Sequence, residues 1–428
     1  MLASLRRKAG EAHHNALKLL TGSAGVNLIL FVSAPFIARL YLPQDVGIFQ
    51  QIISLSAILA TLCTLSYHYA VQLPEQESCA KDVAVLGMLL TICFATVLAF
   101  ILALIPLSAW QHLRLPPSKL NVSLLILAVV IASGFQLVVE QLALRKKEFS
   151  LLALTRVARV GIAQAGALLL GLILKNYLGL LLPYILGIIA GLFVIYRRVF
   201  QCFGQGCISL QGLRRSVKKY WKMPAFDTPS MFVNSVSNEL AVLMFGAFFS
   251  SEKVGFYAIA LRLGKAPLSM IGTAVSEVFF QKTASQYHIN SETIPLIVFN
   301  TIKKLAPISL LVTGSLYLAS PPLVYYYLGP GWTEVSTVIR VLLVWFFFES
   351  VYNPVSTTFL VLNKQEMLFT LNLSLLMARA GAIYYFRTDF VKALLALSIV
   401  SGAMYVIYIL CAYHVARKES KSHVGFGR

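Results

Sequence analysis

Long apolar runs alternate with short polar breaks along the whole chain. Each run is about 20 residues long, which is the length of an α-helix that crosses the hydrocarbon core of a bilayer. Lipid offers the backbone no hydrogen-bond partners, so such runs predict helices rather than open strands. The pattern therefore predicts an all-α integral membrane protein with about 12 spans, at residues 16–38, 48–72, 83–105, 121–143, 151–174, 178–199, 225–249, 256–280, 294–319, 335–361, 367–386 and 391–413.

Composition and charge agree with lipid as the solvent. The chain is 58% hydrophobic and 12% charged, whereas soluble domains carry about 25% charged residues. The net charge of +19 comes from basic residues in the polar breaks, as the positive-inside bias requires, and we do not expect nucleic acid as a partner. With a cytosolic N-terminus, 23 Lys and Arg residues fall at or near cytosolic breaks and six on the opposite side. Both termini are therefore predicted to be cytosolic.

The polar breaks predict how the spans are grouped. Residues 200–224 form the only sizeable cytosolic break, which is basic and rich in glycine. We expect an N-terminal six-helix lobe at 1–205, a cytosolic basic linker at 206–223 and a C-terminal six-helix lobe with a short tail at 224–428. The longest outer break, from Ser320 to Trp332, is too short for an extramembrane domain.

Short motifs recur at equivalent places in the two sets of spans. Residues 46–49 resemble 254–257, residues 144–149 resemble 362–367, and residues 158–161 resemble 378–381. An even helix count makes the two repeats parallel in the membrane. The repeats predict homologous lobes around a central cavity, and rocking of such lobes provides alternating access.

Five cations lie at intramembrane depth, where a charge costs about 2.5–3.5 kcal/mol on insertion scales. Because arginine binds phosphate through two parallel hydrogen bonds, these cations are candidate substrate-binding groups of a shared cavity. The alternative is snorkelling of the long side chains to the interface, which suits Arg156 best and the deep Arg379 least. The five are Arg159, Arg262, Lys265, Arg379 and Arg156.

Two acidic residues also lie deep within spans. Glu349 precedes an Asn-Pro break, and Glu239 follows a polar stretch near the centre of its span. They are candidates for coupling to an H+ or Na+ gradient, or for counter-ions to the cations; the sequence leaves both alternatives open. We find no Walker-type phosphate loop, dinucleotide fingerprint, clustered metal ligands or nucleophile–base arrangement, so we expect no catalytic residue, cofactor or metal.

Several stretches resemble polysaccharide flippases, which export O-antigen and related repeat units and belong to the multidrug/oligosaccharidyl-lipid/polysaccharide exporter superfamily. The resemblance is strong over residues 220–285, where it is carried by residues 220–224, 247–249, 254–258, 266–272 and 277–280. It extends to residues 38–47, 352–356 and 362–365 and so covers nearly the whole chain. It implies a MATE-like fold in the bacterial inner membrane. It also implies a cargo of undecaprenyl-diphosphate-linked oligosaccharide, moved from the cytosolic to the periplasmic leaflet for O-antigen (lipopolysaccharide), capsule or exopolysaccharide assembly. The protein would be a monomer and a transporter, not an enzyme, with a polysaccharide polymerase and a chain-length regulator as expected partners.

Two other functions compete with this interpretation. A MATE-type small-molecule or drug antiporter would share the fold, but a cavity for cationic drugs should be lined with acids, and the deep charges here are mostly basic. A membrane glycosyltransferase or polymerase would need a large outer loop or a cytosolic catalytic domain, and the breaks have no room for either.

Overall fold

The structure is a computed structural model that describes residues 22–106, 116, 118–199, 210–289, 291–362 and 364–425. The described residues form helices and turns without any β-strand. Twelve of these helices are long and apolar enough to cross a membrane. The predicted all-α membrane fold is therefore confirmed.

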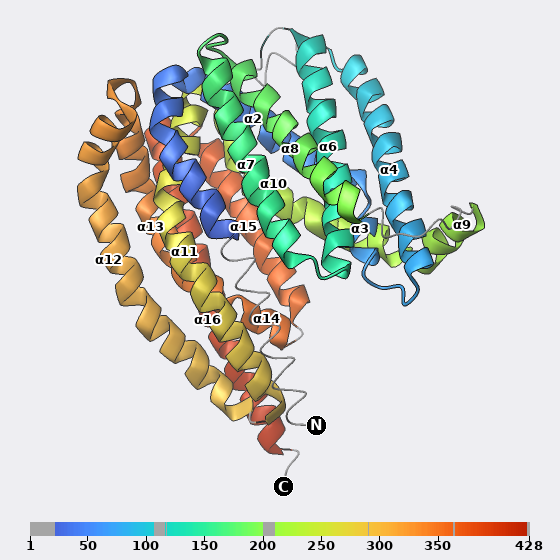
Figure 1. Ribbon diagram of the computed structural model, residues 1–428. Coiled ribbons are helices and arrows are strands. Elements are labelled where there is room, and N and C mark those ends of the chain that lie inside the picture. Colours follow the sequence, from blue (N-terminus) through green and yellow to red (C-terminus); the bar gives the residue numbers. More distant parts are fainter. Residues whose placement is uncertain are drawn as a thin grey trace. The chain divides into compact units, whose positions relative to one another are not determined.

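Contacts within the chain define two compact units (Figure 1). Unit 1 is Met1–Ala247, coloured blue to yellow-green, and unit 2 is Phe248–Arg428, coloured yellow to red. The division into lobes at 205 and 224 stays a prediction. Of the predicted linker, the structure describes the part from Leu210 onward.

Unit 1 holds the first seven spans. They are Gly22–Leu40, α2 (Pro43–Cys63), α4 (Glu77–Leu104), α6 (Lys119–Arg145), α7 (Phe149–Gly171), α8 (Tyr177–Val199) and α10 (Thr228–Phe248), with the shorter α3 (Tyr67–Ala70), α9 (Leu210–Lys219) and π-helical η1 (Met223–Asp227). Helix α6 packs against α2, α4, α7 and α8 and so forms the centre of the unit. Its apolar side chains, such as Ile126 and Val138, are fully buried in two core clusters.

The second span is shorter than predicted. The sequence predicts a helix over 48–72, but α2 ends at Cys63, and Leu65 and Ser66 adopt left-handed backbone conformations with φ of 46° and 59°. Such conformations are unusual outside glycine and break a helix. The Thr228 hydroxyl donates a hydrogen bond to Ser66 at 2.9 Å, which holds the break against the start of α10.

Unit 2 is built around α13. Its helices are α11 (Ser251–Ile289), α12 (Ile294–Leu328), α13 (Glu334–Val355), α14 (Thr357–Val361), α15 (Gln365–Tyr385) and α16 (Phe390–Gly425), with the short η2 (Ser291–Thr293) and η3 (Pro330–Trp332). Helix α13 packs against α11, α12 and α16, while α15 packs against α16. This arrangement brings the middles of α11, α13, α15 and α16 close to one another.

Helix α12 runs further than its sequence indicates. The sequence predicts an outer break from Ser320 to Trp332. The helix instead continues through Pro321 and Pro322 to Leu328 and ends at Gly329, whose φ is +102°. Proline removes a backbone donor and kinks a helix, but membrane helices satisfy the freed carbonyl groups locally and tolerate it.

Candidate functional site

An ion pair joins α11 and α13 in the middle of unit 2. The ammonium nitrogen of Lys265 lies 2.8 Å from Oε2 of Glu349 and donates a hydrogen bond to Oε1 at 3.0 Å. Each residue lies roughly 20 Å along its helix from the end that begins at Ser251 or Glu334, at a rise of about 1.5 Å per residue. The pair therefore lies deep within the span rather than at its ends.

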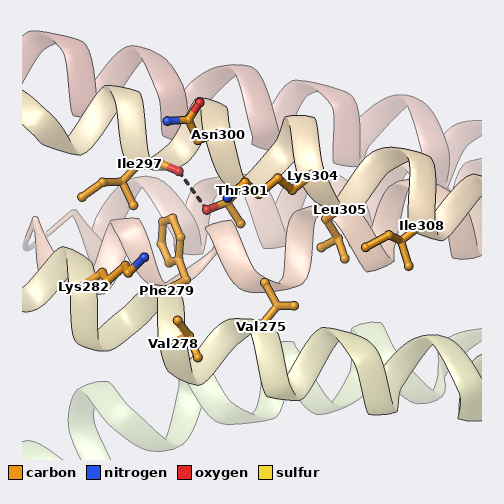
Figure 2. Close-up of a pocket in the computed structure, with 10 residues that line it drawn as sticks. All are labelled: Val275, Val278, Phe279, Lys282, Ile297, Asn300, Thr301, Lys304, Leu305 and Ile308. Atoms are coloured by element: carbon orange, nitrogen blue, oxygen red, sulfur yellow. Dashed lines mark hydrogen bonds between the residues drawn. The ribbon is translucent and has the colours of Figure 1, made fainter.

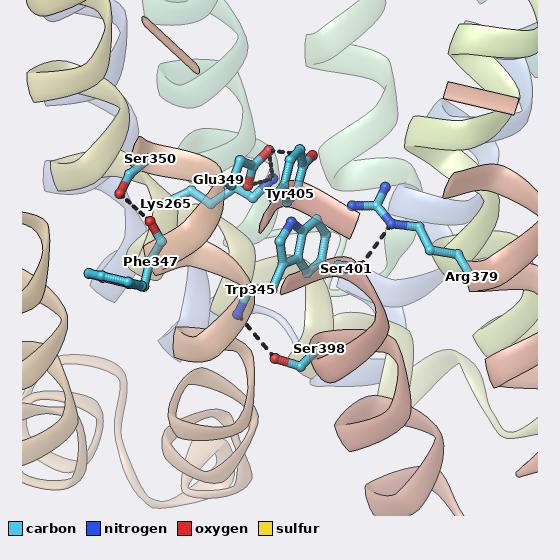
Figure 3. A network of polar contacts seen from close by, with 9 residues as sticks. All are labelled: Lys265, Trp345, Phe347, Glu349, Ser350, Arg379, Ser398, Ser401 and Tyr405. Carbon is cyan, nitrogen blue, oxygen red and sulfur yellow. Dashed lines mark hydrogen bonds and ion pairs between the residues drawn. The ribbon is translucent and has the colours of Figure 1, made fainter. Parts of the chain in front are cut away.

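Arg379 reaches the same place from α15. Its side chain is buried, and its Nε donates a hydrogen bond to the Ser401 hydroxyl of α16 at 2.9 Å. The guanidinium carbon lies 4.5 Å from the centre of the Trp345 ring, and the Lys265 nitrogen lies 4.4 Å from that centre. Figure 3 shows Trp345 between the two cations. Such cation–π contacts contribute roughly 0.5–2 kcal/mol each, the larger value applying to desolvated sites.

Tyrosines of α16 complete the cluster. The Tyr405 hydroxyl donates a hydrogen bond to Glu349 at 3.4 Å and also interacts electrostatically with Arg379, so the phenol lies near both the acid and the second cation. Tyr408 donates to Asn372 of α15 at 3.2 Å, and its ring contacts those of Tyr405 and Tyr352. We call Lys265, Trp345, Glu349, Arg379, Ser401 and Tyr405 the tryptophan cluster.

Three members of this cluster, Lys265, Glu349 and Arg379, are predicted from the sequence as site residues, and the other three are not. Aromatic and small polar residues are common in membrane helices, so no single position distinguishes Trp345, Ser401 or Tyr405 from ordinary helix residues. A usable signal was present in α16, where Ser398, Ser401, Tyr405 and Tyr408 recur at helical spacing on one face. A stripe of hydroxyl groups in the middle of a span indicates a polar partner across the helix interface.

A second polar cluster lies in unit 1. The Ser54 hydroxyl of α2 donates a hydrogen bond to Oε2 of Glu239 in α10 at 2.5 Å, and Gln50 donates to Ser54 at 3.3 Å. Tyr184 of α8 interacts electrostatically with both Glu239 and Arg159, so the predicted acid and cation approach the same phenol.

The remaining two predicted cations have other partners. Arg156 lies 3.8 Å from Glu140 of α6, whose other oxygen accepts a hydrogen bond from Gln136. Arg262 interacts with Tyr327 of α12. The structure thus brings Lys265, Arg379 and Glu349 together in unit 2, and Arg159 and Glu239 around one tyrosine in unit 1. A single cavity shared by all five cations stays a prediction.

Comparisons with solved structures show which fold this is. The chain is similar to the lipid II flippase MurJ in an inward closed conformation, with a TM-score of 0.68, 13% identity and coverage of 94% of this chain and 90% of that one. It is also similar to an inward-facing multidrug resistance MATE family transporter of the MOP superfamily, with a TM-score of 0.65, 15% identity and coverage of 94% and 96%. A Vibrio cholerae MATE transporter matches with a TM-score of 0.62, 14% identity and 98% coverage of both chains. The predicted MATE-like fold is confirmed.

Sequence comparison agrees with the resemblance seen in the motifs. The teichuronic acid biosynthesis protein TuaB of Bacillus subtilis is 24% identical over 155 residues, which are 36% of this chain. The match spans about a third of that relative's own length, 32%. The pattern of the polysaccharide biosynthesis protein family matches residues 13–280. With well over half of its length matched, this multi-pass membrane protein belongs to the polysaccharide biosynthesis protein family.

Proposed function

We propose that the protein is a flippase that moves a lipid-linked oligosaccharide across the membrane by alternating access. The tryptophan cluster carries this proposal, because it holds Lys265 and Arg379 at mid-depth against one aromatic ring. A buried cation requires a partner or a function. A diphosphate head group supplies two anionic acceptors for these donors, and the family membership and the fold shared with a lipid II flippase support such a cargo.

The ion pair supports a specific order of events. Without cargo, Glu349 neutralises Lys265 at 2.8 Å. An arriving diphosphate competes with the carboxylate for the ammonium group, since both are oxygen anions. Glu349 would then be left without its cation, and the carboxylate would return to Lys265 when the cargo leaves. Glu349 would act as the counter-ion of Lys265 between transport cycles. Coupling to an H+ or Na+ gradient would require this carboxylate to bind the ion in the cargo-free state that faces the periplasm.

The location and partners follow from the same proposal. The cargo would be an undecaprenyl-diphosphate-linked repeat unit that passes from the cytosolic to the periplasmic leaflet of the bacterial inner membrane, with both termini of the protein in the cytosol. A polymerase and a chain-length regulator would act on the product, and the protein itself would transport without catalysis.

Two C-terminal fusions test the orientation. A fluorescent protein that folds in the cytosol should fluoresce, and an alkaline phosphatase that needs the periplasm should be inactive. Active phosphatase would contradict this orientation.

Reconstitution in liposomes provides the main test. Wild-type protein should move a fluorescent undecaprenyl-diphosphate oligosaccharide between leaflets, measured by loss of protection from a membrane-impermeant quencher. Arg379→Ala should abolish this movement. The control is Arg387→Gln, which removes a charge at an exposed position beside Tyr384 and should move the cargo at the wild-type rate.

Cells distinguish the flippase from the alternative functions. Arg379→Ala should remove surface glycan at a normal protein level and leave lipid-linked units in the cytosolic leaflet. Loss of glycan without accumulation of those units would favour an assembly enzyme. The drug antiporter would be favoured by two results together. The wild type would move no oligosaccharide, and Arg379→Ala would export a cationic drug as well as the wild type does.

A further inference from the structure

A pocket of about 320 Å³ lies between α11 and α12, and none of its lining residues belongs to the tryptophan cluster. This volume is near the lower end of the range for ligand pockets, about 300–1,000 Å³. Figure 2 shows Val275, Val278 and Phe279 on the side of α11 that faces α12, with Leu305 and Ile308 of α12 opposite them. The apolar wall is formed by Val275, Val278, Phe279, Ile297, Leu305 and Ile308.

The polar part of the pocket is cationic. Lys282 comes from α11 and Lys304 from α12, together with the amide of Asn300 and the hydroxyl of Thr301. Both lysines are exposed, and neither forms an ion pair within the part of the chain that the structure describes. Among the described side chains that line the pocket, none is acidic. The pocket is therefore complementary to an anion.

The position of Lys304 along α12 corresponds to the head-group level of a bilayer. Helix α12 is 35 residues long, and about 20 residues cross the hydrocarbon core. Twenty residues counted back from Leu328 reach Ser309, so Lys304 lies about 7 Å beyond the core boundary at 1.5 Å per residue. An ammonium group at that level faces lipid phosphates rather than acyl chains.

The wall of the pocket continues into an apolar surface. Val278 is 55% exposed and Ile308 is 46% exposed, although both line the pocket. Other large apolar side chains of α12 on the core side of that boundary, Leu310 and Leu311, are also exposed. In a protein that spans a membrane, such a surface contacts acyl chains, so the pocket offers a cationic end and an apolar end to the same molecule.

We propose that this pocket binds an anionic glycerophospholipid, with its phosphate between Lys282 and Lys304 and an acyl chain along the wall toward Ile308. Basic pockets between membrane helices bind anionic head groups in this way. The inference is independent of the proposed transport, because none of the pocket residues belongs to the tryptophan cluster. The pocket between α11 and α12 would thus be a binding site for a lipid of the surrounding bilayer.

Native mass spectrometry of the full-length protein tests the proposal. Protein in micelles that contain equal amounts of phosphatidylglycerol and phosphatidylcholine should retain phosphatidylglycerol preferentially. In the double variant Lys282→Gln/Lys304→Gln this preference should be about 30-fold weaker, since each surface cation contributes about 1 kcal/mol toward an anionic lipid and about 1.36 kcal/mol corresponds to a factor of ten. The matched control is Lys303→Gln, which removes the same charge from the adjacent position of α12, outside the pocket lining, and should retain the wild-type preference.

Two further measurements separate the lipid from a soluble anion. Glycerol 3-phosphate should raise the thermal midpoint of the wild type much less than phosphatidylglycerol does, because it lacks the acyl chain. Val278→Asn should weaken retention of the lipid, since it makes the exposed wall polar. Equal retention by the wild type and the double variant, or equal stabilisation by the soluble phosphate, would overturn the assignment. The ligand of this pocket would instead be undecaprenyl diphosphate if that lipid displaced phosphatidylglycerol at a concentration far below that of phosphatidylglycerol, and this result would overturn the assignment.

Discussion

Lys265 and Glu349 form a two-contact ion pair between α11 and α13, with the lysine nitrogen 2.8 Å and 3.0 Å from the two carboxylate oxygens. The side chains are 34% and 17% exposed, so the pair is partly shielded from water. The same two helices carry a second pair, Lys253–Glu334, whose side chains are 29% and 52% exposed. The two lysines are similarly exposed, whereas Glu334 is far more exposed than Glu349. Unit 2 therefore offers an ion pair with a shielded carboxylate and a control pair with an exposed carboxylate between the same elements.

The shielded pair should show the stronger energetic coupling. We predict that Lys265→Gln and Glu349→Gln each lower the free energy of unfolding, and that the double variant loses less than the sum. The coupling should be about 0.5–3 kcal/mol, the range for residues in contact. Removing one partner alone leaves a half-buried charge without its counter-ion, which is the costly state. Thermal unfolding in detergent, analysed as a double-mutant cycle, measures this coupling.

The control cycle uses Lys253→Gln and Glu334→Gln. Exposed pairs contribute about 0–1 kcal/mol, so this cycle should give the smaller value. Equal coupling in the two cycles would mean that the position of Lys265 and Glu349 inside the unit has no energetic consequence.

Trp345 should matter through its ring and not only through its bulk. It is buried and lies 4.4 Å from the Lys265 nitrogen and 4.5 Å from the Arg379 guanidinium carbon. Trp345→Phe keeps an aromatic face for both cations, whereas Trp345→Leu removes it. We predict that the leucine variant moves lipid-linked oligosaccharide at least several times more slowly than the phenylalanine variant in proteoliposomes, because each lost contact contributes about 0.5–2 kcal/mol.

An exposed tryptophan controls for the substitution itself. Trp221 is 55% exposed and contacts the Phe226 ring outside the tryptophan cluster. Trp221→Leu should transport at the rate of Trp221→Phe. Equal rates for the two Trp345 variants would show that the aromatic face is unnecessary.

Apolar periodicity was sufficient to predict the spans because each membrane helix satisfies its own backbone. The predicted spans 121–143 and 367–386 correspond to Lys119–Arg145 and Gln365–Tyr385. The failures occurred where tertiary contacts override local sequence. Ser66 adopts its left-handed conformation beside Thr228, which is 162 residues away, and no window of the sequence contains both.

The candidate site was predictable only in part for the same reason. Intramembrane depth identified Lys265, Arg379 and Glu349 as unusual, because each charge is expensive there. The sequence left open whether Glu349 couples an ion or neutralises a cation, since that depends on which face of α13 meets α11. The observed pairing supplies the counter-ion. The role of Trp345 could not be foreseen, since it depends on two cations from α11 and α15 meeting one ring.

His68 should make the folded state sensitive to acid. It lies in α3, outside the spans, and is 1% exposed, with its Nδ1 2.6 Å from the Thr64 hydroxyl. Burial lowers the pKa of His68 to about 4, while an unfolded histidine has a pKa of about 6.5. Below pH 6.5 the unfolded state therefore binds a proton that the folded state does not, so stability falls as the pH drops toward 4. At pH 5 the loss should be about 2 kcal/mol, at 1.36 kcal/mol per pH unit.

Thermal unfolding in detergent at pH 7 and pH 5 measures this effect. His68→Gln should show a smaller drop in its midpoint between the two pH values than the wild type does. His414→Gln, at an exposed position in α16, should keep the wild-type drop. An identical drop in the wild type and His68→Gln would assign the acid sensitivity to other groups.

Gly187 sets the close approach of α8 to α7 at the position of Arg159. A Cβ at Gly187 would lie 2.5 Å from the backbone oxygen of Arg159 and 3.3 Å from Cβ of Ala163. The first contact is with backbone, so the helices must move apart, and overpacking of this kind costs about 1–3 kcal/mol. We predict that Gly187→Ala lowers the thermal midpoint in detergent. Gly381, in α15, has no atom within 4 Å of such a Cβ, so Gly381→Ala should be neutral or stabilise by up to about 1 kcal/mol through helix propensity. A midpoint for Gly187→Ala equal to that of Gly381→Ala would show that α7 and α8 do not depend on this contact.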